Sequence, residues 1–334
     1  MSRARRLRAA ASLAVAGGLL VVVLPKVVGT GARAVLEQLA ALTAAQLAAL
    51  VALWLAGLWA HTFVATAALP RLSHRQALTL NLAGSAVANS APFGGALGMG
   101  LNLAMVRSWG LDVKGFAPFT ALTALWNVLV KLALPVLACG LLLAAGSLAP
   151  HVAVAAAVCA GVLTAVLALL AVALVSPRAG AALGRLVHSA VQPLARRVPR
   201  LAHVRVDVAF ADVWRRSTGL LARGWRRMLV SMAAYVLLQA ILLWLVLNML
   251  GSELGPVQVF AGFAVGRALT LLVFTPGGVG LSETGTAALL VGLGGDPATV
   301  AAGVLLFSAL TFALEIPVGG ACALVWWQRQ RRCL

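Results

Sequence analysis

Charged side chains are scarce in this sequence, and acidic side chains are the scarcest. Only 10% of the 334 residues are charged and only 8 are Asp or Glu, whereas 62% are hydrophobic. The apolar runs hold no paired carboxylates, no metal-type spacing of His and Asp, and no motif of an activated nucleophile. The sequence therefore offers little to a hydrolytic active site, and we expect neither a metal nor a cofactor.

Cysteine is also sparse and forms no recognisable framework. Cys139, Cys159 and Cys322 lie within apolar runs, Cys333 lies beside the C-terminus, and no CxxC spacing occurs. A disulfide network or a zinc site is therefore a poor interpretation of these residues.

Long apolar runs, in contrast, are abundant. Several reach the roughly 20 residues that a helix needs to cross a hydrocarbon core of about 30 Å. We expect an all-α polytopic membrane protein, with residues 1–334 forming a single integral membrane domain. About six full spans are predicted, near residues 9–28, 43–69, 116–147, 150–176, 228–250 and 298–327.

The net charge of +18 does not indicate a nucleic-acid-binding protein, because the arginines lie between apolar runs. Residues 177–227 hold eleven arginines, and we expect them to form a basic cytoplasmic amphipathic segment on anionic lipid. With the N-terminus inside, 22 of the 26 basic residues fall on the cytoplasmic side. The positive-inside rule then predicts a multi-pass protein of the bacterial cytoplasmic (inner) membrane with both termini cytoplasmic.

Two further apolar stretches, residues 76–109 and 259–295, are interrupted by proline and glycine. Proline lacks an amide proton and ends a helix, and glycine permits conformations closed to other residues. In lipid the freed backbone groups need protein or water as partners, so each stretch predicts a broken helical hairpin beside a cavity. Tight turns between ordinary spans are the alternative, and the charges do not distinguish re-entrant from fully crossing hairpins. The residues of the two breaks that we assign to a substrate path are Pro92, Gly94, Gly95, Pro276, Gly277, Gly278 and Gly280.

The two interrupted stretches occur at a nearly constant offset in the chain. Pro92 and Pro276 are 184 positions apart, and so are Lys131 and Glu315 in the spans that follow. Residues 43–147 and 228–328 are therefore predicted to form an inverted repeat of span, broken hairpin and span. Paired interrupted segments in inverted halves are typical of alternating-access transporters with a site near the bilayer midplane.

Polar and charged residues at membrane depth are the candidates for a functional site. Asn81, Ser85 and Asn89 follow i, i+4, i+8 spacing and share one helix face, which predicts a head-group path. Hydrogen bonding between helices is the structural alternative for this stripe.

Four ionisable side chains fall within apolar stretches, where charges are costly and usually pair or face a cavity. Arg267 is a candidate anchor for a lipid phosphate, because a guanidinium binds phosphate oxygens in bidentate fashion. Glu283 is a candidate for titration or for binding a cationic head group. Lys131 and Glu315 are intramembrane charges whose structural interpretation is an ion pair between the two halves.

The stretch LTLLVFTPGGVGLSETG, followed by Asp296-Pro297 and Glu315-Ile316-Pro317, resembles the membrane region of lysylphosphatidylglycerol synthases. The resemblance implies a flippase that moves aminoacylated phosphatidylglycerol to the outer leaflet. It assigns Pro276, Gly277, Gly278, Gly280 and Glu283 to the glycine-rich turn of that family. We expect a stand-alone member without the soluble aminoacyltransferase domain, so synthase activity is not carried over.

Two departures from the family pattern leave the head group open. Residues 96–99 are apolar or glycine where charged residues are common, and Ser308 occupies a commonly basic position. The leading hypothesis is a flippase for a polar-headed lipid, anionic or aminoacylated, with membrane lipids as its partners. The alternatives are a membrane-embedded lipid-modifying enzyme and a non-transporting scaffold for a partner lipid synthase or glycosyltransferase.

Overall fold

The computed structural model describes residues 32–90, 94–146, 206–271 and 280–331, with isolated positions between 154 and 189. Throughout these residues the secondary structure is helical, without strands. The elements in chain order are α3 (Ala32–Ala40), α4 (Ala44–Ala68), α5 (His74–Ser90), α6 (Gly94–Ser108), η2 (Val113–Gly115), α7 (Phe116–Ala144), α10 (Val206–Met249), α11 (Pro256–Leu269), α12 (Leu281–Gly292), α13 (Pro297–Ser308), η5 (Ala309–Ala313) and α14 (Glu315–Arg331).

Four helical segments in the described part of the chain are long and apolar enough to cross a membrane. They confirm four of the expected spans and the all-helical membrane architecture. The expected span near residues 9–28, and most of the one near 150–176, lie outside the described residues. The four segments are Ala44–Ala68, Val113–Ala144, Val213–Met249 and Pro297–Arg331.

Helix α10 begins much earlier than the sequence pattern predicts. The expected span starts at Met228, but the helix runs without interruption from Val206. Residues 206–227 contain no proline, so nothing ends the helix at the predicted boundary. The last part of the basic segment is therefore the first part of a long spanning helix, and most of its remainder lies outside the described residues.

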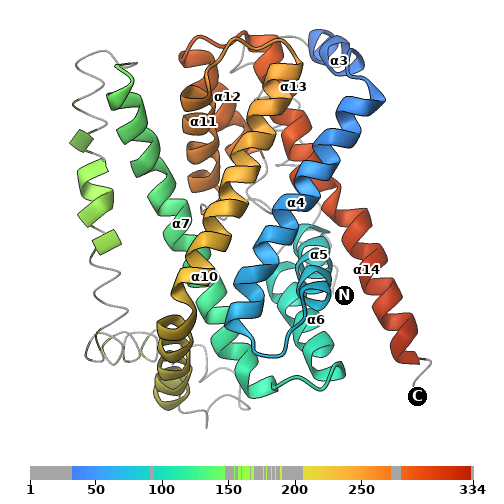
Figure 1. The fold of residues 1–334 in the computed structure, drawn as a ribbon, viewed down its shortest axis with the longest axis vertical. Coiled ribbons are helices and arrows are strands. Elements are labelled where there is room, and N and C mark those ends of the chain that lie inside the picture. The colour runs from blue at the N-terminus through green and yellow to red at the C-terminus, as the bar shows by residue number, and fades with distance from the viewer. Residues whose placement is uncertain are drawn as a thin grey trace.

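Four short helices flank the two proline-glycine sequences. α5 ends at Ser90 and α6 begins at Gly94, while α11 ends at Leu269 and α12 begins at Leu281. The longest of these helices has 17 residues, which cover about 25 Å and fall short of the hydrocarbon thickness. Figure 1 shows α5 and α6 in the lower half of the molecule and α11 and α12 in the upper half. Both expected interruptions are confirmed, although Pro92 and residues 276–278 lie outside the described residues.

Local signals in the sequence explain where several helices begin. Thr43 caps α4 and exchanges hydrogen bonds with Gln46 in a capping box. Pro256 occupies the first turn of α11, where its missing amide proton is not needed. Asp296 caps α13 by accepting bonds from the Thr299 amide at 2.9 Å and hydroxyl at 2.8 Å. These bonds hold the pKa of Asp296 below its ordinary value.

The buried core surrounds α10. Leu243, Val246 and Leu247 of this helix are almost fully buried, together with Trp54 and Leu58 of α4. α7, α11, α12 and α13 contribute further buried side chains of this cluster. In lipid the helices gain little from burial as such, so close van der Waals packing holds this arrangement together.

Glycines let the short helices approach one another closely. A Cβ atom at Gly262 of α11 would collide with Leu290 of α12, and one at Gly266 would collide with Thr286. The GxxxG pattern of Gly262 and Gly266 thus packs α11 against α12. In the other pair, a Cβ atom at Gly98 of α6 would lie 2.7 Å from the Gly84 carbonyl oxygen of α5.

The two halves of the chain, residues 43–147 and 228–328, pack extensively against each other's helices. α4 packs along α10, α5 packs against α14, and α7 packs against α11. The last spanning segment contains a π-helical turn, η5, in which the Leu314 amide donates to the Ala309 carbonyl at 2.8 Å. Such turns occur often at functional sites.

We predict that Gly319→Ala destabilises the protein by about 1–3 kcal/mol through overpacking. A Cβ atom at Gly319 of α14 would collide with the Leu82 backbone carbonyl of α5, which cannot rotate away. Gly320→Ala is the matched control, because nothing lies within 4 Å of its Cβ position. Thermal unfolding in detergent measures both variants, and equal melting temperatures would contradict the close α5–α14 contact.

Candidate functional site

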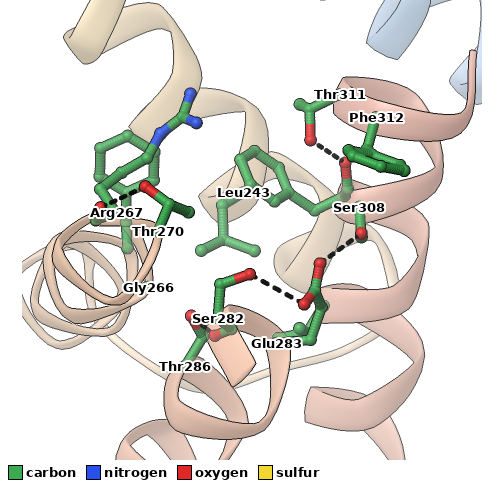
Figure 2. Close-up of a pocket in the computed structure, with 13 residues that line it drawn as sticks. Leu243, Gly266, Arg267, Thr270, Ser282, Glu283, Thr286, Ser308, Thr311 and Phe312 are labelled. Carbon is green, nitrogen blue, oxygen red and sulfur yellow. Dashed lines mark hydrogen bonds between the residues drawn. The ribbon is translucent and has the colours of Figure 1, made fainter. Parts of the chain in front are cut away.

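A cavity of about 90 Å³ opens between α10, α11, α12 and the last spanning segment. It has room for a few water molecules. Its walls combine apolar side chains with hydroxyls and one charge of each sign, as Figure 2 shows. We call it the upper cavity; it is lined by Leu243, Phe263, Gly266, Arg267, Thr270, Ser282, Glu283, Thr286, Val304, Phe307, Ser308, Thr311 and Phe312.

Glu283 lies in the first turn of α12 and is buried. Its carboxylate accepts hydrogen bonds from the Gly280 amide at 2.6 Å, from the Ser282 hydroxyl at 2.8 Å and from the Ser308 hydroxyl at 2.6 Å. Gly280 has φ of +94°, a conformation that favours glycine and turns the chain into the helix. Glu283 therefore closes the glycine turn and ties α12 to α13.

Arg267 of α11 lies on the opposite side of the upper cavity from Glu283 (Figure 2). Its guanidinium packs over the Phe263 ring at 5.4 Å, and Nη2 donates to the Tyr235 hydroxyl at 3.4 Å. Among the described residues it forms no ion pair. A guanidinium carries five N–H donors, so most donors of Arg267 have no partner among the residues that the structure describes.

A second cavity, of about 250 Å³, lies between α5 and α6, and we call it the lower cavity. The structure places Asn81 and Ser85 of the predicted stripe in its wall together with Gly95, whereas Asn89 is not in the lining. Gly94 is buried against the backbone of α5 instead. Asn102 also lines the lower cavity, and its buried side-chain oxygen has no hydrogen-bond partner among the described residues.

A chain of polar side chains connects the two cavities. Asn81 in α5 contacts the His61 ring in α4, with 3.3 Å between Nδ2 and Nδ1. The centroids of the His61 ring and the Tyr235 ring in α10 are 4.8 Å apart. The Tyr235 hydroxyl accepts a hydrogen bond from Arg267 in α11. Tyr235 is not among the residues that the sequence pattern singles out. One signal was available, because Tyr235 is the single tyrosine of the chain and lies within a span.

Lys131 and Glu315 do not form the ion pair considered from the sequence. Among described residues the only ion pair joins Arg33 to Glu37, and Glu315 instead hydrogen-bonds with Ser85. Lys131 lies close enough to Arg267 for the two positive charges to interact. The helix pairing explains the difference, because α14 faces α5 and α7 faces α11.

The chain matches the family model described as the lysylphosphatidylglycerol synthase TM region over residues 9–319. It belongs to this family. The match confirms the resemblance carried by the proline-glycine turn, and the matched range includes every residue that lines the two cavities. No curated protein matches the chain.

We predict that Glu283→Ala lowers stability by about 1–3 kcal/mol, because three donors lose their acceptor in a partly buried place. Glu283→Gln should cost less, since a glutamine still accepts from the Gly280 amide in the same capping geometry. The matched control is Glu253→Ala, which removes an exposed carboxylate that forms no hydrogen bond or ion pair with the described residues. Thermal unfolding of the three variants in detergent is the measurement, and equal losses for Glu283→Ala and Glu253→Ala would refute the capping role.

Proposed function

We propose that this chain is a lipid flippase of the bacterial cytoplasmic membrane. It moves a polar-headed lipid, anionic or aminoacylated, between leaflets while the acyl tails stay in the bilayer. Family membership indicates a membrane lipid-related function. The observation that carries the flippase proposal is the polar chain from Asn81 to Arg267, which connects cavities beside two short-helix pairs.

A head group that crosses the hydrocarbon core must exchange its water for other polar partners. Without such partners each buried polar group costs several kcal/mol, and a charge costs more. The side chains of the lower cavity, the polar chain and the upper cavity supply hydrogen-bonding groups from α5 to α12. Apolar side chains on the outer face of α7, including Leu137 and Leu141, are exposed and suit contact with acyl chains.

The packing of the helices supports an inverted repeat as the basis of alternating access. Each half contains a long helix, a pair of short helices and another long segment. The first short helix of each pair packs against the last segment of the other half, α5 against α14 and α11 against α7. Lys131 and Glu315 are 184 positions apart and lie in these two helix pairs. Lys131 of α7 interacts with Arg267 of α11, and Glu315 of α14 interacts with Ser85 of α5. Such halves rocking about a central site are a common basis for transport.

The distribution of charge supports an orientation with the lower end in the cytoplasm. The C-terminal end of α14 points downward in Figure 1, and there Arg331 stacks on Trp327 at 3.8 Å. Trp326 on the same turn donates to Ser108 at the end of α6. The turns before α11 and α13 carry the acidic residues Glu253 and Asp296 instead. Arginine gathered at one end is typical of the cytoplasmic side, and the tryptophans place this end at a membrane interface.

We predict that the purified chain in liposomes accelerates leaflet exchange of a fluorescent phospholipid, measured by chemical quenching of the outer leaflet. Arg267→Gln should slow this exchange about tenfold or more, because a charged hydrogen-bond donor is lost from the path. Tyr235→Phe should slow it less, because only the hydroxyl between His61 and Arg267 is removed.

Arg33→Gln is the matched control, because Arg33 is exposed and paired with Glu37 outside the polar chain. Exchange at the unmodified rate in both path variants would remove the polar chain from the mechanism. A wild-type chain that exchanges neither anionic, zwitterionic nor aminoacylated lipids would end the flippase proposal.

A further inference from the structure

Every hydroxyl in the lining of the upper cavity already donates its hydrogen to the protein. Thr270, Thr286 and Thr311 donate to backbone carbonyls of their own helices at 2.6–2.8 Å. Ser282 and Ser308 donate to the Glu283 carboxylate. A hydroxyl has one donor hydrogen and two acceptor lone pairs. These five groups therefore present neutral acceptors to anything that enters.

The donors available to a ligand are concentrated at Arg267. It is the only basic side chain in the described lining of the upper cavity, and Tyr235 occupies one of its donors. Outside the lining, Lys131 and Glu315 both lie within electrostatic range of Arg267 and carry opposite charges. Glu283, the acidic residue of the lining, already accepts three hydrogen bonds. A carboxylate offers about four lone-pair sites, so Glu283 has little capacity left for a cationic ligand.

This arrangement matches one class of lipid head group. A phosphodiester is a pure acceptor and pairs with a guanidinium through parallel hydrogen bonds. The hydroxyls of a glycerol or another polyol can donate to the neutral hydroxyl oxygens of the lining, among them Thr270 beside Arg267 and Thr311 of the last span. An ammonium group would meet the like charge of Arg267 and a carboxylate that already accepts three hydrogen bonds.

We propose that the upper cavity selects anionic phospholipids with a hydroxyl-bearing head group over lipids that carry an ammonium group. This inference rests on the proposed function only in that the cavity takes a lipid head group. It names Arg267 as the phosphate ligand, and Thr270 and Thr311 as acceptors for the polyol hydroxyls.

Native mass spectrometry of the full chain in detergent tests the inference with lipids of identical acyl chains. Phosphatidylglycerol is the probe with phosphate and hydroxyls, phosphatidic acid has the phosphate without the polyol, and phosphatidylethanolamine has an ammonium. We expect phosphatidylglycerol to be retained about tenfold or more over phosphatidylethanolamine, with phosphatidic acid between them. Equal or preferred retention of phosphatidylethanolamine, or of an aminoacylated phosphatidylglycerol, would overturn the inference.

Variants separate the two parts of the site. Arg267→Gln should reduce retention of phosphatidylglycerol roughly 10- to 100-fold, and Arg267→Lys should reduce it less. Arg33→Gln should leave it unchanged. The double variant Thr270→Val with Thr311→Val should lower phosphatidylglycerol to the level of phosphatidic acid. Thr120→Val is its control, because Thr120 makes the same type of backbone hydrogen bond on α7 and is not in the cavity lining.

Unchanged retention in Arg267→Gln, or loss of both anionic lipids alike in the threonine double variant, would contradict the assignment. Melting temperatures establish that each variant is folded before its lipid retention is compared. Selective retention without leaflet exchange would keep this inference and remove the flippase function. Leaflet exchange without head-group selectivity would support the flippase function and contradict this inference.

Discussion

The hydrocarbon core of a bilayer offers no water to polar groups, so they must find hydrogen-bond partners within the protein. The arrangement of the polar side chains follows from this constraint. Tyr235 illustrates it, because its hydroxyl accepts from Arg267 while its ring lies against His61, which in turn contacts Asn81. Four helices are thereby connected through side chains that would be costly to bury singly. The same constraint explains Glu283, whose carboxylate is enclosed by three donors. Arg267 departs from this pattern, since most of its donors have no partner among the described residues, and it is the side chain that we propose as the anchor of a ligand.

Close backbone contact is the second determinant of the fold. Within each short-helix pair, glycines remove the side chains that would hold the two helices apart, at Gly266 in one pair and Gly98 in the other. Between the halves, Gly319 brings α14 against the backbone of α5. Because packing rather than burial from water drives helix association in lipid, these contacts position the polar side chains on α5 and α11.

Much of the fold was predictable from the sequence, because hydrophobic length and helix-breaking residues are local signals. The described spans and both interruptions appear where proline, glycine and apolar runs indicate them. Helix α10 continues before the expected start of the span, because a change in charge does not end a helix. The ion pair considered for Lys131 and Glu315 does not form, because equal offsets in the chain do not determine which helices face each other. The contact of His61 with Tyr235 depends on the rotation of two helices about their axes, which composition does not encode.

The π-helical turn η5 gives the last span two different faces. Ser308, just before this turn, points toward Glu283 of α12, whereas Glu315, just after it, bonds with Ser85 of α5. One additional residue in a helix advances the direction of the following side chains by about 100°. The last span thereby contacts both short-helix pairs, α12 through Ser308 and α5 through Glu315. Removing one residue from 309–313 would restore regular winding and turn Glu315 away from Ser85, while the Ser308 contact with α12 would keep its place.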